Sequence, residues 1–141
     1  MNSRTITQII NVPANSVYQY VSDPRNLPEW APGFARAVKY IDGSWTVEMV
    51  DGVAKLAFVD QNDLGVLDHW VTMPDRCQIL NPMRVIPNGS DSEIIFTLFQ
   101  RPEMSDRQFN SDAVLVSADL KRLKVVLEAP EHQLQFREPD S

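Results

Sequence analysis

A long amphipathic segment near the C-terminus, from Ser105 to Ala129, constrains the fold of this chain more than any other feature. Its apolar residues recur at alternating steps of four and three, which places them in one stripe of an α-helix. The stripe consists of Phe109, Ala113, Val116, Leu120, Leu123 and Leu127. Ser105 and Gln108 predict a capping box at the start of the helix, and Pro130 predicts its end. At about 1.5 Å per residue such a helix is roughly 35–38 Å long, so a large surface has to cover its stripe.

Turn signals divide the chain before this helix into short runs of strand-like sequence. Asp42-Gly43 and Asn88-Gly89 are such signals, and the spacing of the turns is typical of consecutive hairpins. The runs between turns are rich in Val, Ile, Phe and Trp. They span Arg4–Asn11, Phe34–Ile41, Trp45–Val50, Val53–Gln61, Val66–Met73, Cys77–Ile86 and Ser92–Gln100. Connections this short exclude parallel crossovers, so we expect an antiparallel sheet in an α+β fold, and a sheet this large has to curl.

The segment after the first predicted strand carries a distinctive order of residues. Ile10–Pro24 has the form apolar strand, Pro-Ala, Val-aromatic and Asp-Pro, and Leu27-Pro28-Glu29-Trp30 follows it. This opening resembles that of the START-like, Bet v 1-like superfamily, also called SRPBCC or polyketide cyclase/dehydrase-like. The resemblance implies the helix-grip fold, a seven-stranded curved antiparallel sheet wrapped on a long C-terminal helix, with two short helices after the first strand. It implies this domain for residues 1–130, a polar C-terminal tail for residues 131–141, and a central hydrophobic cavity.

The composition limits the partners of the chain. Its 141 residues suit one domain, and a formal net charge of -6 with a pI near 4.8 disfavours binding to nucleic acid or to an anionic membrane. No apolar run approaches the ~20 residues that span a bilayer, so we expect no integral membrane segment. The single Cys77 cannot form an internal disulfide, which favours a reducing compartment, and we expect a cytoplasmic protein. The pattern leaves open whether the chain forms a homodimer.

Few residues of this chain have the spacing of a known chemical site. His69 and His132 are the only histidines, and neither has a second ligand residue at the spacing of a metal site. Glycine-rich nucleotide motifs and the G-x-S-x-G motif do not occur in the sequence. We therefore expect no metal and no cofactor, and no catalytic signature decides whether the chain is an enzyme.

His69 is the strongest chemical candidate, because alternation along Val66–Met73 places it among apolar neighbours. Leu67, His69 and Val71 share one face, which we expect to point into the grip, and Trp70 lies on the other face. An imidazole titrates near neutral pH and suits general acid/base work. The alternative is a core histidine whose ring is satisfied by a backbone carbonyl, or one that is exposed at the rim.

Pro82 interrupts the run Cys77–Ile86 and predicts a bulge or a kink there. Arg84 then reaches either solvent or the mouth of the cavity, where it would hold a carboxylate or an enolate oxygen. The other candidates for ligand contact are side chains that we expect on the inner surface or at the ends of the cavity. They are Trp30, Phe34, Trp45, Leu56, Phe58, Asn81, Met83, Phe96, Phe109 and Val116, together with His69.

Three functions follow from these patterns and from the resemblance. The first is binding of a small, largely apolar ligand, such as a lipid, a polyketide or an aromatic metabolite, in a cavity between the curved sheet and the C-terminal helix. The second is a polyketide cyclase or dehydratase-type enzyme, with His69 as general acid/base and Arg84 as the group that stabilises an enolate. The third is a protein-binding adaptor of the Hsp90-activator type, which would use the outer face of the sheet.

Overall fold

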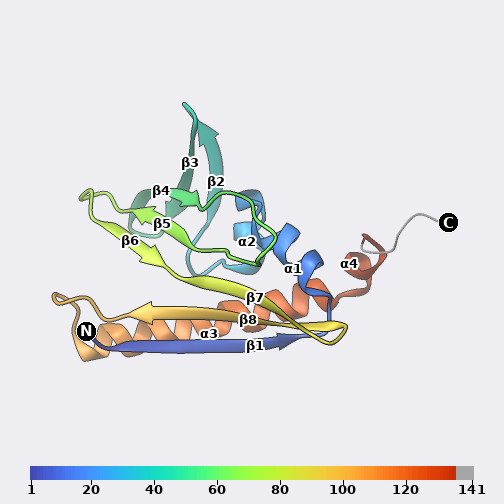
Figure 1. Cartoon of the computed structure of the whole chain (residues 1–141). Helices are drawn as coiled ribbons and strands as arrows, with labels where there is room; N and C mark the ends of the chain where they lie inside the picture. The colour runs from blue at the N-terminus through green and yellow to red at the C-terminus, as the bar shows by residue number, and fades with distance from the viewer. Residues whose placement is uncertain (136–141) are drawn as a thin grey trace.

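A computed structural model describes residues 1–135 of the chain, and it shows one long helix against a strongly curved antiparallel sheet (Figure 1). In chain order the elements are β1 (Ser3–Ile10), α1 (Ala14–Val21), the 3-10 helix η1 (Pro24–Asn26), α2 (Leu27–Trp30), β2 (Ala37–Ile41), β3 (Ser44–Met49), β4 (Gly52–Phe58), β5 (His69–Thr72), β6 (Gln78–Asn81), β7 (Met83–Asn88), β8 (Asp91–Phe99), α3 (Asp106–Glu128) and α4 (Pro130–Gln135). The predicted α+β fold with two short helices after the first strand is confirmed.

Helix α3 begins and ends where its capping residues predict. The Ser105 hydroxyl accepts a hydrogen bond from the backbone N–H of Gln108 at 3.1 Å, and Ala129 caps the other end. Every residue of the predicted apolar stripe is buried except Val116, which is half-buried. The chain then continues from Pro130 as α4, where the sequence predicts only a polar tail, because a proline suits the first position of a new helix. Residues 136–141 of that predicted tail lie outside the described residues.

Pro82 divides the strand that the sequence predicts over Cys77–Ile86 into β6 and β7. β6 pairs with β5 and β7 pairs with β8, so the backbone partners change at the proline. The described chain therefore has eight strands in two sheets, ordered β1-β8-β7 and β2-β3-β4-β5-β6, where the sequence predicts seven in one sheet. Proline has no N–H for a strand ladder, but its carbonyl oxygen accepts the backbone N–H of Thr97 at 3.0 Å. This bond holds the two sheets together at the kink.

The side chain of Asp68 supplies a hydrogen bond at this junction, where the backbone ladder between strands is interrupted. Its carboxylate accepts the backbone N–H of Met83 at 2.8 Å and lies 3.6 Å from the guanidinium of Arg84. Gly65 approaches β7 so closely that a Cβ there would lie 2.1 Å from the Val85 carbonyl oxygen, and its φ of +73° also favours glycine. The sheet turns at this junction while its backbone groups stay hydrogen-bonded.

Two predicted strands begin later than the sequence pattern suggests. Phe34 donates its backbone N–H to the Ala31 carbonyl, which continues the turn after α2, so β2 begins after this turn and not at Phe34. The residues before His69 pair with β7 only through an isolated bridge between Val66 and Arg84, so β5 begins at His69. A local turn decides the first boundary, and a bridge to β7 instead of the β4 ladder decides the second.

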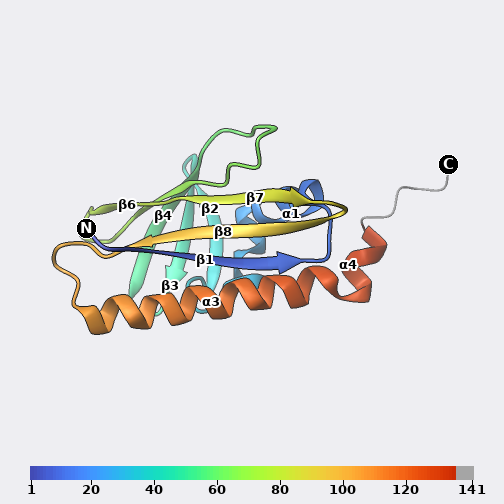
Figure 2. The same ribbon diagram turned by 60° about the horizontal axis from the view of Figure 1, so that its bottom comes forward.

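The two sheets lie at different angles to α3 (Figure 2). β1 and β8 run along the helix, whereas β3 and β4 cross its direction. Many of the largest fully buried side chains belong to β1, β7, β8, α1 and the C-terminal part of α3, including Ile10, Met83, Ile94, Leu120, Leu123 and Leu127. The main core therefore lies where the first sheet packs on the helix.

Candidate functional site

A cavity of about 380 Å³ lies between the second sheet and α3, and we call it the inner cavity. Strands β3 to β6 and β8 contribute one wall, α3 contributes the opposite wall, and α2 with the turn after it contributes a third. The lining is mostly apolar and includes the rings of Trp30, Phe34, Phe58 and Phe96. Its polar residues are His69, Asn81, Arg101, Gln108, Asp112 and Asp119.

His69 and Asn81 form a polar pair on the sheet wall of the inner cavity. They are register partners on β5 and β6, and Asn81 Nδ2 lies 3.4 Å from His69 Nε2. His69 Nδ1 lies 3.0 Å from the carbonyl oxygen of Leu67. Because a carbonyl oxygen only accepts, Nδ1 carries the proton and Nε2 is the acceptor that faces the amide. The rings of Phe58 and Phe96 flank the imidazole at centroid distances of 5.0 and 6.2 Å.

Burial lowers the pKa of His69, because the charged imidazolium would lose its hydration among these rings. The hydrogen bond to Leu67 and the charge of Asp68 oppose this shift without cancelling it. His69 is therefore neutral at neutral pH. A neutral imidazole in the inner cavity is a hydrogen-bonding group and a candidate general base, but it does not attract an anionic ligand.

The α3 wall of the inner cavity carries two carboxylates. Asp112 accepts a hydrogen bond from Gln108 Nε2 at 2.7 Å, and Asp119 accepts the backbone N–H of Gly33. Burial raises the pKa of Asp119 to about 6, and the bond from Gly33 and the charge of Arg122 oppose that shift. Because this wall is acidic, it disfavours a ligand that carries a negative charge.

Trp30 closes the inner cavity from α2. It is 5% exposed, and its indole N–H is buried with no hydrogen-bond partner in the part of the chain that the structure describes. A buried donor without a partner costs about 1–3 kcal/mol, so an acceptor brought within reach would stabilise this end of the cavity. The sequence allows two roles for Trp30, a structural residue that closes the end of the grip and a residue that contacts the ligand. Its position suits both roles.

Most of the predicted contact residues line the inner cavity. These residues are Trp30, Phe34, Leu56, Phe58, His69, Asn81, Phe96 and Val116. Alternation brings together those that lie on strands, because residues two apart on a strand point to the same side. Trp30 and Phe34 come from α2 and the turn after it, and Val116 comes from α3. Their contact with a ligand stays a prediction.

Three other candidates lie away from the inner cavity. Met83 begins β7 and is 1% exposed, so it belongs to the closed core. Phe109 packs toward β1, where the guanidinium carbon of Arg4 lies 5.0 Å from its ring centroid. Arg84 is exposed and pairs with Asp68, because alternation along β7 turns it away from the buried side of the sheet. It does not reach an enolate in the inner cavity.

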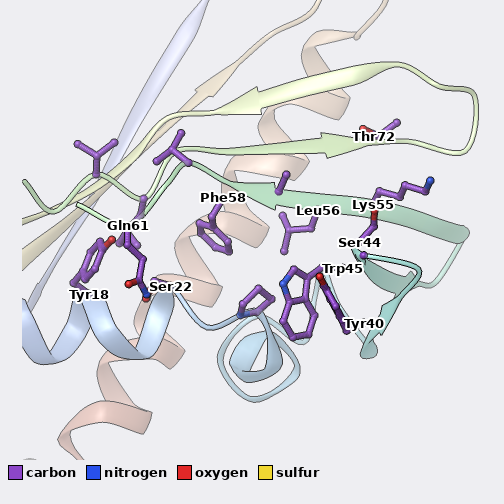
Figure 3. Close-up of a pocket in the computed structure, with 16 residues that line it drawn as sticks. Tyr18, Ser22, Tyr40, Ser44, Trp45, Lys55, Leu56, Phe58, Gln61 and Thr72 are labelled. Carbon is purple, nitrogen blue, oxygen red and sulfur yellow. The ribbon is translucent and has the colours of Figure 1, made fainter. Parts of the chain in front are cut away.

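Trp45 lines a different hollow, which we call the outer groove. This groove of about 480 Å³ lies between α1, η1, the β2–β3 hairpin and β4 (Figure 3). Trp45 pairs with Tyr40 across the hairpin, and their ring centroids are 5.0 Å apart. Trp45 lies on the same side of the sheet as Leu56, its register partner on β4, as the alternation predicts. Because it lies near the hairpin turn, it lines the outer groove with Pro24 of η1 and not the inner cavity beside α3.

Sequence reasoning missed four of the residues that α3 contributes to the inner cavity, Gln108, Asp112, Leu115 and Asp119. Val116 and Leu120 of the predicted stripe line the cavity as well. The missed residues each precede a member of the apolar stripe by one position, so they form its border. That spacing was a usable signal, but polar residues at such positions usually face solvent. Arg101 and Met104 come from the loop before α3 and had no comparable signal.

Solved structures of other proteins share this architecture, whereas no family model and no curated protein sequence matches the chain. The protein XoxI from Bacillus cereus is 20% identical with a TM-score of 0.73, and the match covers 94% of this chain and 99% of that one. The Aha1 dimer from Colwellia psychrerythraea is 13% identical with a TM-score of 0.71, covering 91% of this chain and 97% of that one. A START superfamily protein from Mycobacterium smegmatis is 13% identical with a TM-score of 0.66, covering 89% and 97%.

The chain has the START-like, Bet v 1-like fold. At these identities the likeness concerns the fold alone. The ligand and the chemistry of this START-like protein therefore have to be inferred from the residues of the site. Within residues 1–135 no three His, Cys, Asp or Glu side chains are grouped so that they could hold a metal ion. The helices in the same part of the chain are all too short or too polar to cross a bilayer.

Proposed function

We propose that the chain binds a small, largely apolar and uncharged molecule in the inner cavity. The volume of about 380 Å³ lies near the lower end of the ~300–1,000 Å³ range of small-molecule sites. A compact ring system or a short chain fits such a volume better than a whole phospholipid. The acidic α3 wall supports an uncharged ligand over a carboxylate.

The observation that carries this proposal is the polar pair His69 and Asn81 among aromatic rings. Sites for small molecules combine apolar walls with a few placed polar groups, which fix the orientation of the ligand. His69 Nε2 can accept a hydrogen bond, and the Asn81 amide can donate one or accept one. A ligand hydroxyl both donates and accepts, so it suits this pair.

A comparison of naphthol with naphthalene tests the polar pair. We expect naphthol to bind one site per chain about fivefold more tightly, because one hydrogen bond contributes on the order of 1 kcal/mol. His69→Leu should remove this preference while naphthalene still binds, as measured by quenching of tryptophan fluorescence. His132→Asn is the matched control, because this second histidine lies at α4 near Tyr20 and outside the inner cavity. Equal binding of the two probes by the native chain would argue against a polar contact at His69.

The fixed tautomer of His69 favours an enzymatic function as the second candidate. The Leu67 carbonyl holds the proton on Nδ1, so Nε2 is free of a proton and can act as a general base. Arg84 cannot stabilise an enolate from its outer position, and Asn81 would have to do so. For any substrate found to turn over, His69→Gln should slow turnover by about 10²–10⁴-fold with little change in binding. Turnover that survives this substitution would remove His69 from the chemistry.

A further inference from the structure

The inner cavity and the outer groove are separated by a thin wall. In the described chain their linings share two residues, Leu56 and Phe58, both on β4. The short helices contribute to different hollows, because Pro24 of η1 lines the outer groove whereas Leu27 and Trp30 of α2 line the inner cavity. The two hollows, of about 480 and 380 Å³, therefore adjoin each other at these two side chains of β4.

Of the two shared residues, only Phe58 has no partner residue on β3. Trp45 and Leu56 are the last register partners of β3 and β4, and Leu56 is 4% exposed. Phe58 lies beyond that pair and is half-buried, so β3 does not extend beside it. On one side its ring is 5.0 Å from the His69 ring of the inner cavity. Figure 3 shows the same ring pointing from β4 toward the space between Tyr18 and Trp45.

We propose that Phe58 sets the maximum length of the ligand, because its ring closes the inner cavity beside the His69–Asn81 pair. This inference rests on the proposed binding function. A ligand held at His69 lies next to the Phe58 ring. Its remaining atoms have to fit within the inner cavity, because the ring blocks the route into the outer groove. Removal of the ring joins the two hollows and allows a longer molecule to extend toward Trp45.

A series of linear primary alcohols from hexanol to hexadecanol tests this inference by titration calorimetry. For the native chain we expect affinity to rise about three- to fourfold per methylene until the inner cavity is full, and then to stop rising. Phe58→Ala should move this break to alcohols several carbons longer. Phe96→Ala is the matched control, because it removes the same ring from a second aromatic neighbour of His69, and Phe96 lines the inner cavity but not the outer groove. Its break should move less.

Fluorescence distinguishes passage through the wall from a mere increase in volume. A long-chain alcohol with a terminal bromine should quench Trp45 in the Phe58→Ala chain, and Trp45→Phe in the same background should remove that part of the quenching. In the native chain Trp45 should not be quenched. Phe58→Leu provides a milder opening if the alanine variant does not fold.

The outcomes separate the two proposals. Equal breaks for Phe58→Ala and Phe96→Ala, or no quenching of Trp45 by the brominated tail, would overturn the role of Phe58 while leaving ligand binding intact. Binding of no alcohol by the native chain or by either variant would overturn the proposed function, and the role of Phe58 with it.

Discussion

Two neighbouring stripes of helix α3 have different roles in this molecule. The packed stripe consists of Phe109, Ala113, Leu120, Leu123 and Leu127, all of which are buried. The cavity stripe consists of Gln108, Asp112, Leu115 and Asp119, which line the inner cavity with Val116. Both stripes have the same helical spacing. The comparison teaches that amphipathic spacing shows which side of a helix faces the sheet, but not whether the sheet reaches it.

The path of the sheet explains the difference between the two stripes. β1 runs along α3 and packs on it, so its side chains cover the packed stripe. At Pro82 the backbone partners change, and the second sheet curves over the helix at another angle. The cavity stripe therefore faces strands that are too distant to fill the space between them.

The largest expected difference between the stripes is in stability. Leu123 is 0% exposed, so Leu123→Ala should lower the free energy of unfolding by about 2–5 kcal/mol, because it leaves a cavity in a packed core. Leu115→Ala is the matched control, and we expect a change below about 1 kcal/mol because Leu115 is 48% exposed. Urea unfolding measures both. Similar losses at the two positions would mean that the stripes do not differ in packing.

Val116→Trp should affect binding more than stability. Val116 is half-buried and lines the inner cavity, so a larger side chain there occupies space that a ligand needs. We expect naphthol affinity to fall at least about tenfold, which is about 1.4 kcal/mol, with a smaller change in unfolding free energy. Val125→Trp serves as the control, because Val125 is 69% exposed. Undiminished binding by the Val116 variant would place the ligand outside the inner cavity.

The smallest expected effect concerns the pH dependence of Asp119. Its pKa of about 6 in the folded chain lies above the ordinary value of 3.8, so the folded state holds this proton more strongly than the unfolded state. The free energy of unfolding should therefore fall as the pH rises from about 4 to 6. Asp119→Asn should be more stable than the native chain at about pH 8, by roughly 1 kcal/mol or less because the group is partly solvated, and equal to it below about pH 4. Urea unfolding at several pH values measures this, and a variant less stable at pH 8 would contradict it.

Much of the fold could be predicted because local signals agreed with one another. Ser105 and Pro130 predicted the ends of α3, and the Asp42-Gly43 and Asn88-Gly89 turns do separate consecutive strands. Pro82 predicted a kink, but not that the strand would change partners there. That exchange depends on bonds between distant residues, such as the Thr97 N–H and the Pro82 carbonyl.

The site was harder to predict than the fold. Alternation correctly placed His69 on the buried side of β5, and it placed Trp45 on the same side of the sheet as Leu56. It could not show that Trp45 and His69 line different hollows. The position of a helix relative to a strand depends on side chains far apart in the sequence.

By itself, therefore, the sequence predicted helix α3, most of the strands and their order, because spacing, capping and turn residues act over a few positions of chain. Its resemblance to the START-like superfamily predicted the fold. Only the tertiary structure decided that Arg84 pairs with Asp68 outside the sheet and that polar residues of α3 border a cavity. It also decided that Phe58 stands between two hollows. These features depend on the exchange of partner strands at Pro82, which results from long-range contacts, whereas the proline by itself predicts only a kink.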